Sequence, residues 1–380
     1  MITNGIPEIA YSPDGGGAGG HPSALKGREE GLRDGFYEGY LRGRSKVIAG
    51  APRPQFPARQ VRVLYVGSGK GFPYSPIDEA VIATLRQMTA ETIICEPGVP
   101  LAELAASTRP DLLLVLDGMD LPLEQVDAVR AGGTRTAVWL TDDPYYTDIT
   151  MTMVPHYDYV FTLERNCIDL YRSLGCANVH YLPFAAYPEH YRPTVTQAPV
   201  RRTVGFIGSA YWNRVQFFQP IIGQLMNRGL TINGIWWDRL PEYPAYTDRI
   251  DLGKWMGPAE TAEVYGSTKI IINLHRSPFE ETANKNSAGI TGVSPNPRTF
   301  EIAASGTLQL VDARGDLASF YTPGMEIETF TTAEELIGKI DFYLTHEKER
   351  QEIVFRALQR TYRDHMYSNR IDELLRVIFG

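Results

Sequence analysis

The chain has 380 residues, enough for about two domains, and its 43% hydrophobic and 22% charged residues exclude an intrinsically disordered protein. It has no apolar run near the roughly 20 residues that a transmembrane helix needs, and its first residues lack the basic and apolar regions of a secretory signal. The net charge of −8 argues against non-specific nucleic-acid binding, and the three widely spaced cysteines fit a protein of the reducing cytoplasm.

Residues 1–60 are predicted to be an arm outside the globular domains. A glycine-rich tract at 15–20 precedes a repeat of five glycines spaced four residues apart, and a proline-containing linker at 51–57 ends the arm. The repeat consists of Gly27, Gly31, Gly35, Gly39 and Gly43. Its spacing predicts a helix over about 27–43 with all five glycines on one face, although each costs about 1 kcal/mol relative to alanine. We expect this face to pack closely on another helix, of this chain or of a second copy in a homodimer. The alternative is a frayed arm with an accidental repeat.

Short apolar runs alternate with helical patterns over residues 61–195. Each run is nearly continuous and rich in branched aliphatic residues, which is typical of strands in a parallel sheet that is covered on both faces. The runs lie at 61–66, 92–95, 112–116, 136–140, 159–162 and 179–182. We therefore predict a Rossmann-like domain here.

The same alternation restarts after a proline-containing segment at 187–199 and predicts a second Rossmann-like domain over 196–362. Strands are expected at 203–207, 231–236, 270–274 and 308–311, and helices at 212–227, 259–267, 297–305, 333–344 and 347–362. Residues 363–380 would form a C-terminal helix that can return to the first domain. Two such α/β domains enclose a cleft between the carboxyl ends of their strands, and we expect the ligand there.

The helix expected at 297–305 carries a candidate nucleotide site. Asn296 suits the N-cap and Pro297 the first helical position, so this helix would offer free N–H groups to an anion. Arg298 would bind phosphate oxygens, and Glu301, on the same face, would bind ribose hydroxyls. The alternative is an ordinary Arg–Glu ion pair on a surface helix.

The strand expected at 203–207 leads to a second candidate phosphate site. It runs into Gly208 and Ser209, whose small side chains would let the backbone approach a ligand. Arg214 follows within reach of a diphosphate, and the alternative is that it is simply solvated.

The strand expected at 270–274 ends in two further site candidates. His275 and Arg276 are expected to point into the same cleft, His275 as a catalytic group and Arg276 as a donor-binding group. The polar loop at 280–287 is expected to be mobile and to close over the donor.

The segment around Glu301 resembles a known family. Glu301 begins an E-x-x-A-x-G pattern that ends at Gly306, and this pattern resembles the helix-to-strand segment of GT-B glycosyltransferases, whose glutamate binds the donor ribose. Together with the motifs at 320–326, 332–336 and 365–370, it is similar to the CgeB spore maturation proteins, over about residues 200–375.

This resemblance implies a GT-B fold and transfer of a sugar from a nucleoside diphosphate sugar, expected to be a UDP-sugar, without a bound metal. Trp255 and Met256 lie where GT-B enzymes hold the nucleobase, and a tight turn with a core tryptophan is the alternative. Many retaining GT-B enzymes carry a second glutamate where this chain has Val293, which leaves the stereochemical outcome open.

The acidic turn after the strand at 136–140 is the candidate for the catalytic base. Two adjacent carboxylates, Asp142 and Asp143, precede a proline, and one at a strand end can accept the proton of an acceptor hydroxyl. We assign this role to Asp143, and an aspartate turn before proline is the alternative. The glycine-rich segment at 67–71 lacks the spacing of a P-loop and is expected to form the acceptor wall. The histidines have no metal-ligand spacing, so no metal site is predicted.

The sequence thus predicts a cytoplasmic GT-B glycosyltransferase whose acceptor is a glycoconjugate or a protein, for example at the cell or spore surface. Two other functions stay open. One is a sugar-nucleotide epimerase on the same fold, which would need carboxylates placed for elimination. The other is a non-catalytic nucleotide-binding or assembly module that acts through the glycine-striped helix.

Overall fold

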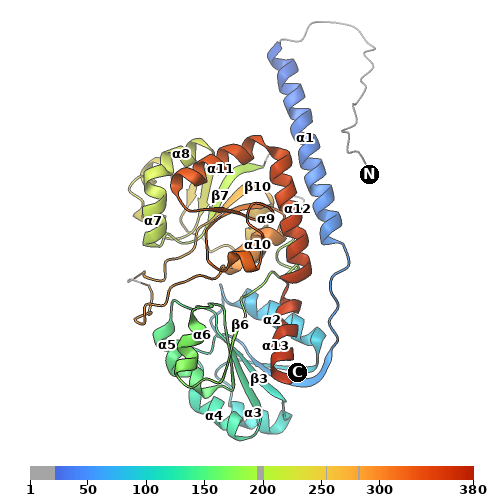
Figure 1. The fold of residues 1–380 in the computed structure, drawn as a ribbon, viewed down its shortest axis with the longest axis vertical. Helices are drawn as coiled ribbons and strands as arrows, with labels where there is room; N and C mark the ends of the chain where they lie inside the picture. Colours follow the sequence, from blue (N-terminus) through green and yellow to red (C-terminus); the bar gives the residue numbers. More distant parts are fainter. Residues whose placement is uncertain (1–21, 195–200, 254, 281–282) are drawn as a thin grey trace. The chain divides into compact units, whose positions relative to one another are not determined.

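Figure 1 shows a computed structural model of the chain, which describes residues 22–194, 201–253, 255–280 and 283–380. The chain divides into two compact units, Met1–Leu41 and Arg42–Gly380. The second unit contains two six-stranded parallel sheets with helices packed against them, so the predicted two-domain α/β architecture is confirmed. No helix among the described residues is both long and apolar enough to cross a membrane.

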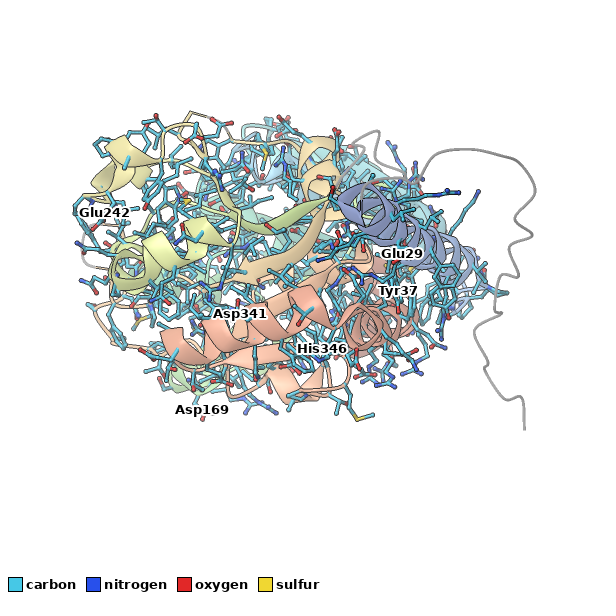
Figure 2. All side chains as sticks on the ribbon, turned by 90° about the horizontal axis from the view of Figure 1, so that it is seen from above. Glu29, Tyr37, Asp169, Glu242, Asp341 and His346 are labelled. Atoms are coloured by element: carbon cyan, nitrogen blue, oxygen red, sulfur yellow. The ribbon has the colours of Figure 1, made fainter. Side chains whose placement is uncertain are left out.

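Helix α1 (Pro22–Ala49) contains the glycine repeat and extends beyond the predicted range at both ends. Figure 2 shows Glu29 and Tyr37 on this helix. A Cβ added to any of the five glycines would meet no atom within 4 Å. Close packing of this face on another helix, of this chain or of a second copy, stays a prediction. The tract at 15–20 lies outside the described residues.

The first sheet has the order β2-β1-β3-β4-β5-β6. Its strands are β1 (Arg59–Val66), β2 (Thr89–Cys95), β3 (Leu112–Leu116), β4 (Arg135–Trp139), β5 (Tyr159–Thr162) and β6 (Asn178–Tyr181). One face packs on α2 (Ser75–Met88) and α13 (Tyr367–Phe379), and the other on α3 (Leu101–Thr108), α4 (Leu123–Ala131), α5 (Thr147–Met153) and α6 (Cys167–Ser173). Because both faces are covered, every residue of β3 is buried, and its sequence is apolar throughout. The last helix of the chain belongs to this first core.

The second sheet has the order β12-β11-β10-β7-β8-β9. Its strands are β7 (Arg202–Ile207), β8 (Leu230–Asn233), β9 (Ile250–Asp251), β10 (Thr268–Asn273), β11 (Leu308–Asp312) and β12 (Glu328–Phe330). Its helices are α7 (Trp212–Phe218), α8 (Ile222–Asn227), α9 (Pro258–Gly266), α10 (Pro297–Ala304), α11 (Ala333–Thr345) and α12 (Glu347–Asp364). The helix predicted at 212–227 is divided by a 3₁₀ turn at Gln219–Ile221, because Pro220 cannot donate a backbone hydrogen bond to a continuous helix.

The loop that follows β10 contacts the first domain. The N–H of Lys285 donates to the carbonyl of Tyr145 (2.7 Å), and the N–H of Asp148 donates to the carbonyl of Lys285 (2.9 Å). The carboxylate of Asp148 accepts from the N–H and the hydroxyl of Ser287 (2.8 and 2.6 Å). These bonds connect Lys285 and Ser287 to the start of α5 and the residues before it, and the mobility of the loop at 280–287 and its closure over the donor stay predictions.

Candidate functional site

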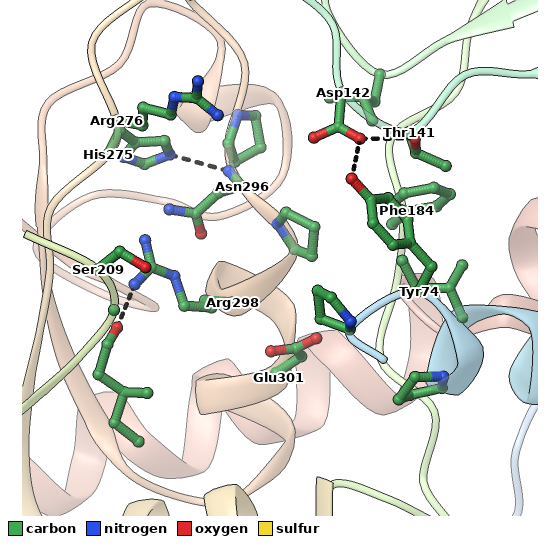
Figure 3. A pocket seen from close by; sticks show the side chains of 18 of the residues that line it. Tyr74, Thr141, Asp142, Phe184, Ser209, His275, Arg276, Asn296, Arg298 and Glu301 are labelled. Carbon is green, nitrogen blue, oxygen red and sulfur yellow. Dashed lines mark hydrogen bonds between the residues drawn. The ribbon is translucent and has the colours of Figure 1, made fainter. Parts of the chain in front are cut away.

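A cavity of about 640 Å³ lies between the two sheets, on the side where the carboxyl ends of their strands face each other. Its walls come from the loop before α2 and the residues after β4 in the first domain, and from the residues after β7 and β10 and the start of α10 in the second. Figure 3 shows Tyr74, Thr141 and Asp142 on one side, and Ser209, Arg276, Arg298 and Glu301 on the other. All the site residues predicted from the sequence line this cavity: Asp143, Gly208, Ser209, Arg214, Trp255, Met256, His275, Arg276, Arg298 and Glu301.

Two guanidinium groups flank the backbone at Gly208. Arg298 donates to the carbonyl of Ile207, and Nη1 of Arg214 donates to the carbonyl of Ser209 (2.9 Å). A Cβ on Gly208, whose φ is +152°, would lie 2.6 Å from Nη1 of Arg298 and 2.9 Å from Nη1 of Arg214, so a larger residue would displace both arginines. Neither arginine has a carboxylate within ion-pair distance among the described residues. Two neighbouring positive charges without a negative partner are suited to binding an anion.

The start of α10 is closed by side chains more fully than the sequence indicates. Oδ1 of Asn296 accepts from the N–H of Thr299 (3.1 Å), and the N–H of Asn296 itself donates to Nε2 of His275 (2.9 Å). Pro297 has no N–H to offer. The expected set of free N–H groups is therefore largely used, and the side chain of Arg298 is the principal donor that this helix presents to an anion.

Glu301 extends from the next turn of α10 into the cavity, as Figure 3 shows. It forms no ion pair with Arg298, and its carboxylate accepts no hydrogen bond from the described residues. Burial raises its pKa to about 7 against the opposing effect of Arg298. The hydroxyl of the neighbouring Tyr265 is also buried, with no hydrogen-bond partner in the described part of the chain. An unpartnered carboxylate in a cavity is an acceptor for ligand hydroxyls, which fits the predicted ribose contact.

His275 is buried and both of its ring nitrogens are occupied. Nδ1 contacts Oδ1 of Asp312 (2.5 Å), and Nε2 accepts from the N–H of Asn296 (2.9 Å). Burial lowers the pKa of His275 to about 4 despite the adjacent Asp312 carboxylate, so the ring is neutral at pH 7 with its proton on Nδ1. A ring in this state neither accepts nor donates a substrate proton. His275 positions the start of α10, which differs from the catalytic role that we expected.

The two adjacent aspartates after β4 have different surroundings. Asp143 is 1% exposed, and its two carboxylate oxygens accept from the hydroxyls of Thr162 (2.6 Å) and Tyr171 (2.7 Å). Burial raises its pKa to about 6. Because both oxygens are used inside the domain, Asp143 is not placed to take a proton from a substrate. Asp142, in contrast, faces the cavity, where it accepts from the hydroxyl of Tyr74 (2.8 Å; Figure 3).

A chain of polar contacts lies behind Asp142. The hydroxyl of Thr141 is 2.9 Å from the Asp142 carboxylate and also contacts Asp117, and Asp117 pairs with Lys70 (2.7 Å). Burial raises the pKa of Asp142, while the hydroxyls of Tyr74 and Thr141 stabilise its ionised form. Tyr74 lies 68 positions before Asp142 in the chain, and no sequence pattern links the two.

Glu164, like Tyr74, is a site residue that was not predicted from the sequence. It is 2% exposed, and one of its oxygens accepts from the N–H groups of Val293 and Ser294 (both 3.1 Å). Its other oxygen accepts from the N–H of Asn166 (3.1 Å). A carboxylate of the first domain thus reaches the position of Val293, but both of its oxygens hold backbone groups.

Two exposed aromatic rings lie at the rim of the cavity. Trp255 is 54% exposed and Phe72 is 43% exposed, and their ring centroids are 6.1 Å apart in an edge-to-face arrangement. The carbonyl of Met256 accepts from the hydroxyl of Thr261 (3.3 Å). Trp255 is therefore not a core tryptophan, and its ring lies on the cavity side.

Comparison with known sequences agrees with this geometry. A family model described as glycosyl transferase-like matches residues 214–376, which include most of the second-domain wall. The spore protein CgeB of Bacillus subtilis (strain 168) is 28% identical over 316 residues, which cover 83% of this chain and 96% of that protein.

Solved structures with the same fold include several glycosyltransferases. A glycosyltransferase of Rickettsia africae matches 85% of this chain and 100% of its own with a TM-score of 0.57 and 12% identity. The sucrose-phosphate synthase of Thermosynechococcus elongatus matches 84% of this chain and 99% of its own with a TM-score of 0.56 and 10% identity. HepE of Anabaena, solved with UDP, matches 83% of this chain and 100% of its own with a TM-score of 0.56 and 11% identity. The chain is therefore similar to the spore protein CgeB, and it has the two-domain GT-B fold of these glycosyltransferases.

Proposed function

We propose that the cavity binds a nucleoside diphosphate sugar, with UDP as the nucleotide, and transfers the sugar to a hydroxyl of an acceptor. The observation that carries this proposal is the pair of guanidinium groups at Gly208, Arg214 and Arg298, which have no carboxylate partner among the described residues. Glu301 supports it, because a free carboxylate one turn from Arg298 can accept from the ribose hydroxyls.

The transfer needs stabilisation of the departing diphosphate. As the bond between the anomeric carbon and the phosphate oxygen breaks, negative charge gathers on that oxygen, and Arg214 and Arg298 are preorganised to receive it. Nε of Arg214 and Nη2 of Arg298 both donate to the carbonyl of Leu274 (3.0 and 3.3 Å), so neither side chain has to reorganise during the reaction. We propose that these two charges replace a bound metal.

The acceptor hydroxyl needs a base, and we propose Asp142 for this role in place of Asp143. Its carboxylate faces the cavity from the first domain, opposite the arginines. The hydroxyl proton passes to Asp142 as the acceptor oxygen bonds to the anomeric carbon and the nucleoside diphosphate leaves.

The three buried cysteines form no disulfide, and this supports the cytoplasm as the place of the reaction.

Calorimetry of the full chain with UDP, GDP, TDP and ADP tests the donor. Binding of one nucleoside diphosphate, with much weaker binding of its nucleoside, is the expected result. Mass spectrometry of acceptor mixtures incubated with the matching sugar nucleotide then tests transfer. If none of the four nucleotides binds, the proposal is wrong, and a non-catalytic assembly module becomes the better account.

A further inference from the structure

Arg276 is a third arginine of the cavity, and it also lacks a negative partner among the described residues. Its guanidinium lies on the rings of Tyr211 (4.3 Å to the ring centroid), Tyr145 (4.5 Å) and Tyr146 (5.8 Å). Its Nη2 donates to the carbonyl of Ala283 (2.7 Å), while its Nε is buried and has no hydrogen-bond partner among the described residues. No carboxylate of the described residues lies within ion-pair distance of it. The rings hold the side chain in place without neutralising its charge.

Arg314, which lines the same cavity, forms the ion pair with a carboxylate that is usual for a buried arginine. Its guanidinium pairs with the carboxylate of Asp312 through Nη2 (2.8 Å) and Nε (3.0 Å). A buried guanidinium without such a partner is unfavourable unless a ligand supplies the anion. The diphosphate of a sugar nucleotide carries one charge on each phosphate, which Arg214 and Arg298 match. The diphosphate therefore has no third negative charge to pair with Arg276.

The position of Arg276 identifies the part of the substrate beside it. Arg276 and Arg214 lie on the same ring, that of Tyr211, at 4.3 and 5.3 Å from its centroid. The other two rings, Tyr145 and Tyr146, belong to the first-domain wall shortly after the proposed base. Arg276 therefore lies between the phosphate-binding group and the acceptor side. In a glycosyl transfer, the sugar occupies the space between the leaving phosphate and the attacking hydroxyl.

We propose that Arg276 binds a carboxylate of the transferred sugar, so that the donor is the nucleoside diphosphate of a uronic-acid-type sugar. A carboxylate fits this place because a guanidinium can donate two parallel hydrogen bonds to it, whereas a neutral sugar leaves the charge unmatched. The inference rests on the proposed glycosyl transfer and adds the chemical class of the sugar.

Calorimetry with matched acidic and neutral donors tests it. The pairs are UDP-glucuronate with UDP-glucose and GDP-mannuronate with GDP-mannose, each measured beside the free nucleoside diphosphate. We expect the acidic donor of the accepted nucleotide to bind about 10- to 100-fold more tightly than its neutral partner, as for a charge-assisted hydrogen-bonded pair. Arg276→Gln should abolish this difference and leave the affinity for the free nucleoside diphosphate unchanged. Arg276→Lys, which keeps the charge, should retain part of the difference and replaces Arg276→Gln if that variant does not fold.

Arg239→Gln is the matched control. Arg239 also lies on two aromatic rings, Trp236 (4.6 Å) and Trp212 (5.1 Å), and donates to the carbonyl of Ala210 (3.1 Å), but it does not line the cavity. It should keep the full preference for the acidic donor.

Two results would overturn the inference while leaving the proposed function intact. One is equal binding of the acidic and neutral donors by the unmodified chain. The other is a loss of free nucleotide affinity in Arg276→Gln as large as the loss for the acidic donor, because Arg276 would then act on the diphosphate. Absence of all nucleotide binding refutes the proposed function, and the inference with it.

Discussion

Glu301 makes a prediction that can be checked without any ligand. In the folded chain, burial raises its pKa to about 7 from an ordinary value of 4.5. Between these two values the folded chain holds a proton that the unfolded chain has released, so the free energy of unfolding falls as the pH rises through this window. Above pH 7 the ionised carboxylate is present in both states and this contribution no longer changes. The difference between 4.5 and about 7 corresponds to about 3 kcal/mol, since each tenfold change in proton affinity is worth about 1.4 kcal/mol.

Glu301→Gln removes this titration while keeping the size of the side chain. The variant should therefore lose stability less steeply than the unmodified chain between pH 4.5 and 7, and it should be more stable at pH 8 by up to about 3 kcal/mol. Urea unfolding at pH 5 and pH 8 gives the difference between the two chains at each pH. Taking this difference cancels the other titrating groups, among them Asp143, whose pKa burial raises to about 6.

Glu334→Gln serves as the control, because Glu334 is an exposed carboxylate in the first turn of α11. It should show the pH dependence of the unmodified chain. If Glu301→Gln also runs parallel to the unmodified chain from pH 5 to pH 8, then Glu301 is not a partly buried, unpartnered carboxylate, and its assignment to the ribose hydroxyls loses its physical basis.

Three further predictions concern the phosphate site, the base and the arm. Arg298→Ala should weaken binding of the nucleoside diphosphate by about 1.5–3 kcal/mol and leave binding of the nucleoside unchanged in calorimetry; equal losses for both ligands would contradict a phosphate contact. Asp142→Asn should lower turnover about 10²- to 10⁴-fold at unchanged donor affinity. Asp143→Asn should instead reduce the free energy of unfolding by about 1–3 kcal/mol. If Asp143→Asn lowers turnover and Asp142→Asn does not, Asp143 is the base. Replacing Gly35 and Gly39 with leucine should shift a homodimer towards monomer in light scattering or lower the melting temperature, and an unaltered mass with an unaltered melting temperature would show that the glycine face packs on nothing.

The strands of both sheets were predictable where their sequence pattern is long and local. The central strands β3 and β10 are covered on both faces, so β3 reads as a continuous apolar run and β10 contains one at residues 270–272. The edge strands β9 and β12 have two and three residues, too few to form a pattern, and neither was predicted. Pro220 was visible within the helix expected at 212–227, but the apolar periodicity on both sides of it outweighed this signal.

The composition of the cavity was predictable for a topological reason. Parallel strands place their carboxyl ends at one edge of the sheet, so residues that follow β4, β7 and β10 must meet there wherever they lie in the sequence. The roles of these residues depend on individual hydrogen bonds to distant partners. Tyr171 lies 28 positions from Asp143, and Asn296 lies 21 positions from His275. A local sequence pattern cannot reveal hydrogen bonds between residues so far apart in the sequence.

The two roles that the structure does not support share one physical cause. Asp143 and His275 are ionisable groups at strand ends, which is a good reason to suspect catalysis, but hydroxyls and a backbone N–H already satisfy the atoms that would react. The groups that remain available show the opposite feature: the carboxylate of Glu301 and the guanidinium of Arg276 line the cavity and lack charged partners among the described residues. A folded chain keeps an unpartnered polar or charged group in a cavity at a cost in stability, and a ligand that pairs with this group removes that cost. In this chain the unmatched groups, more than the residue types, therefore indicate where the substrate binds.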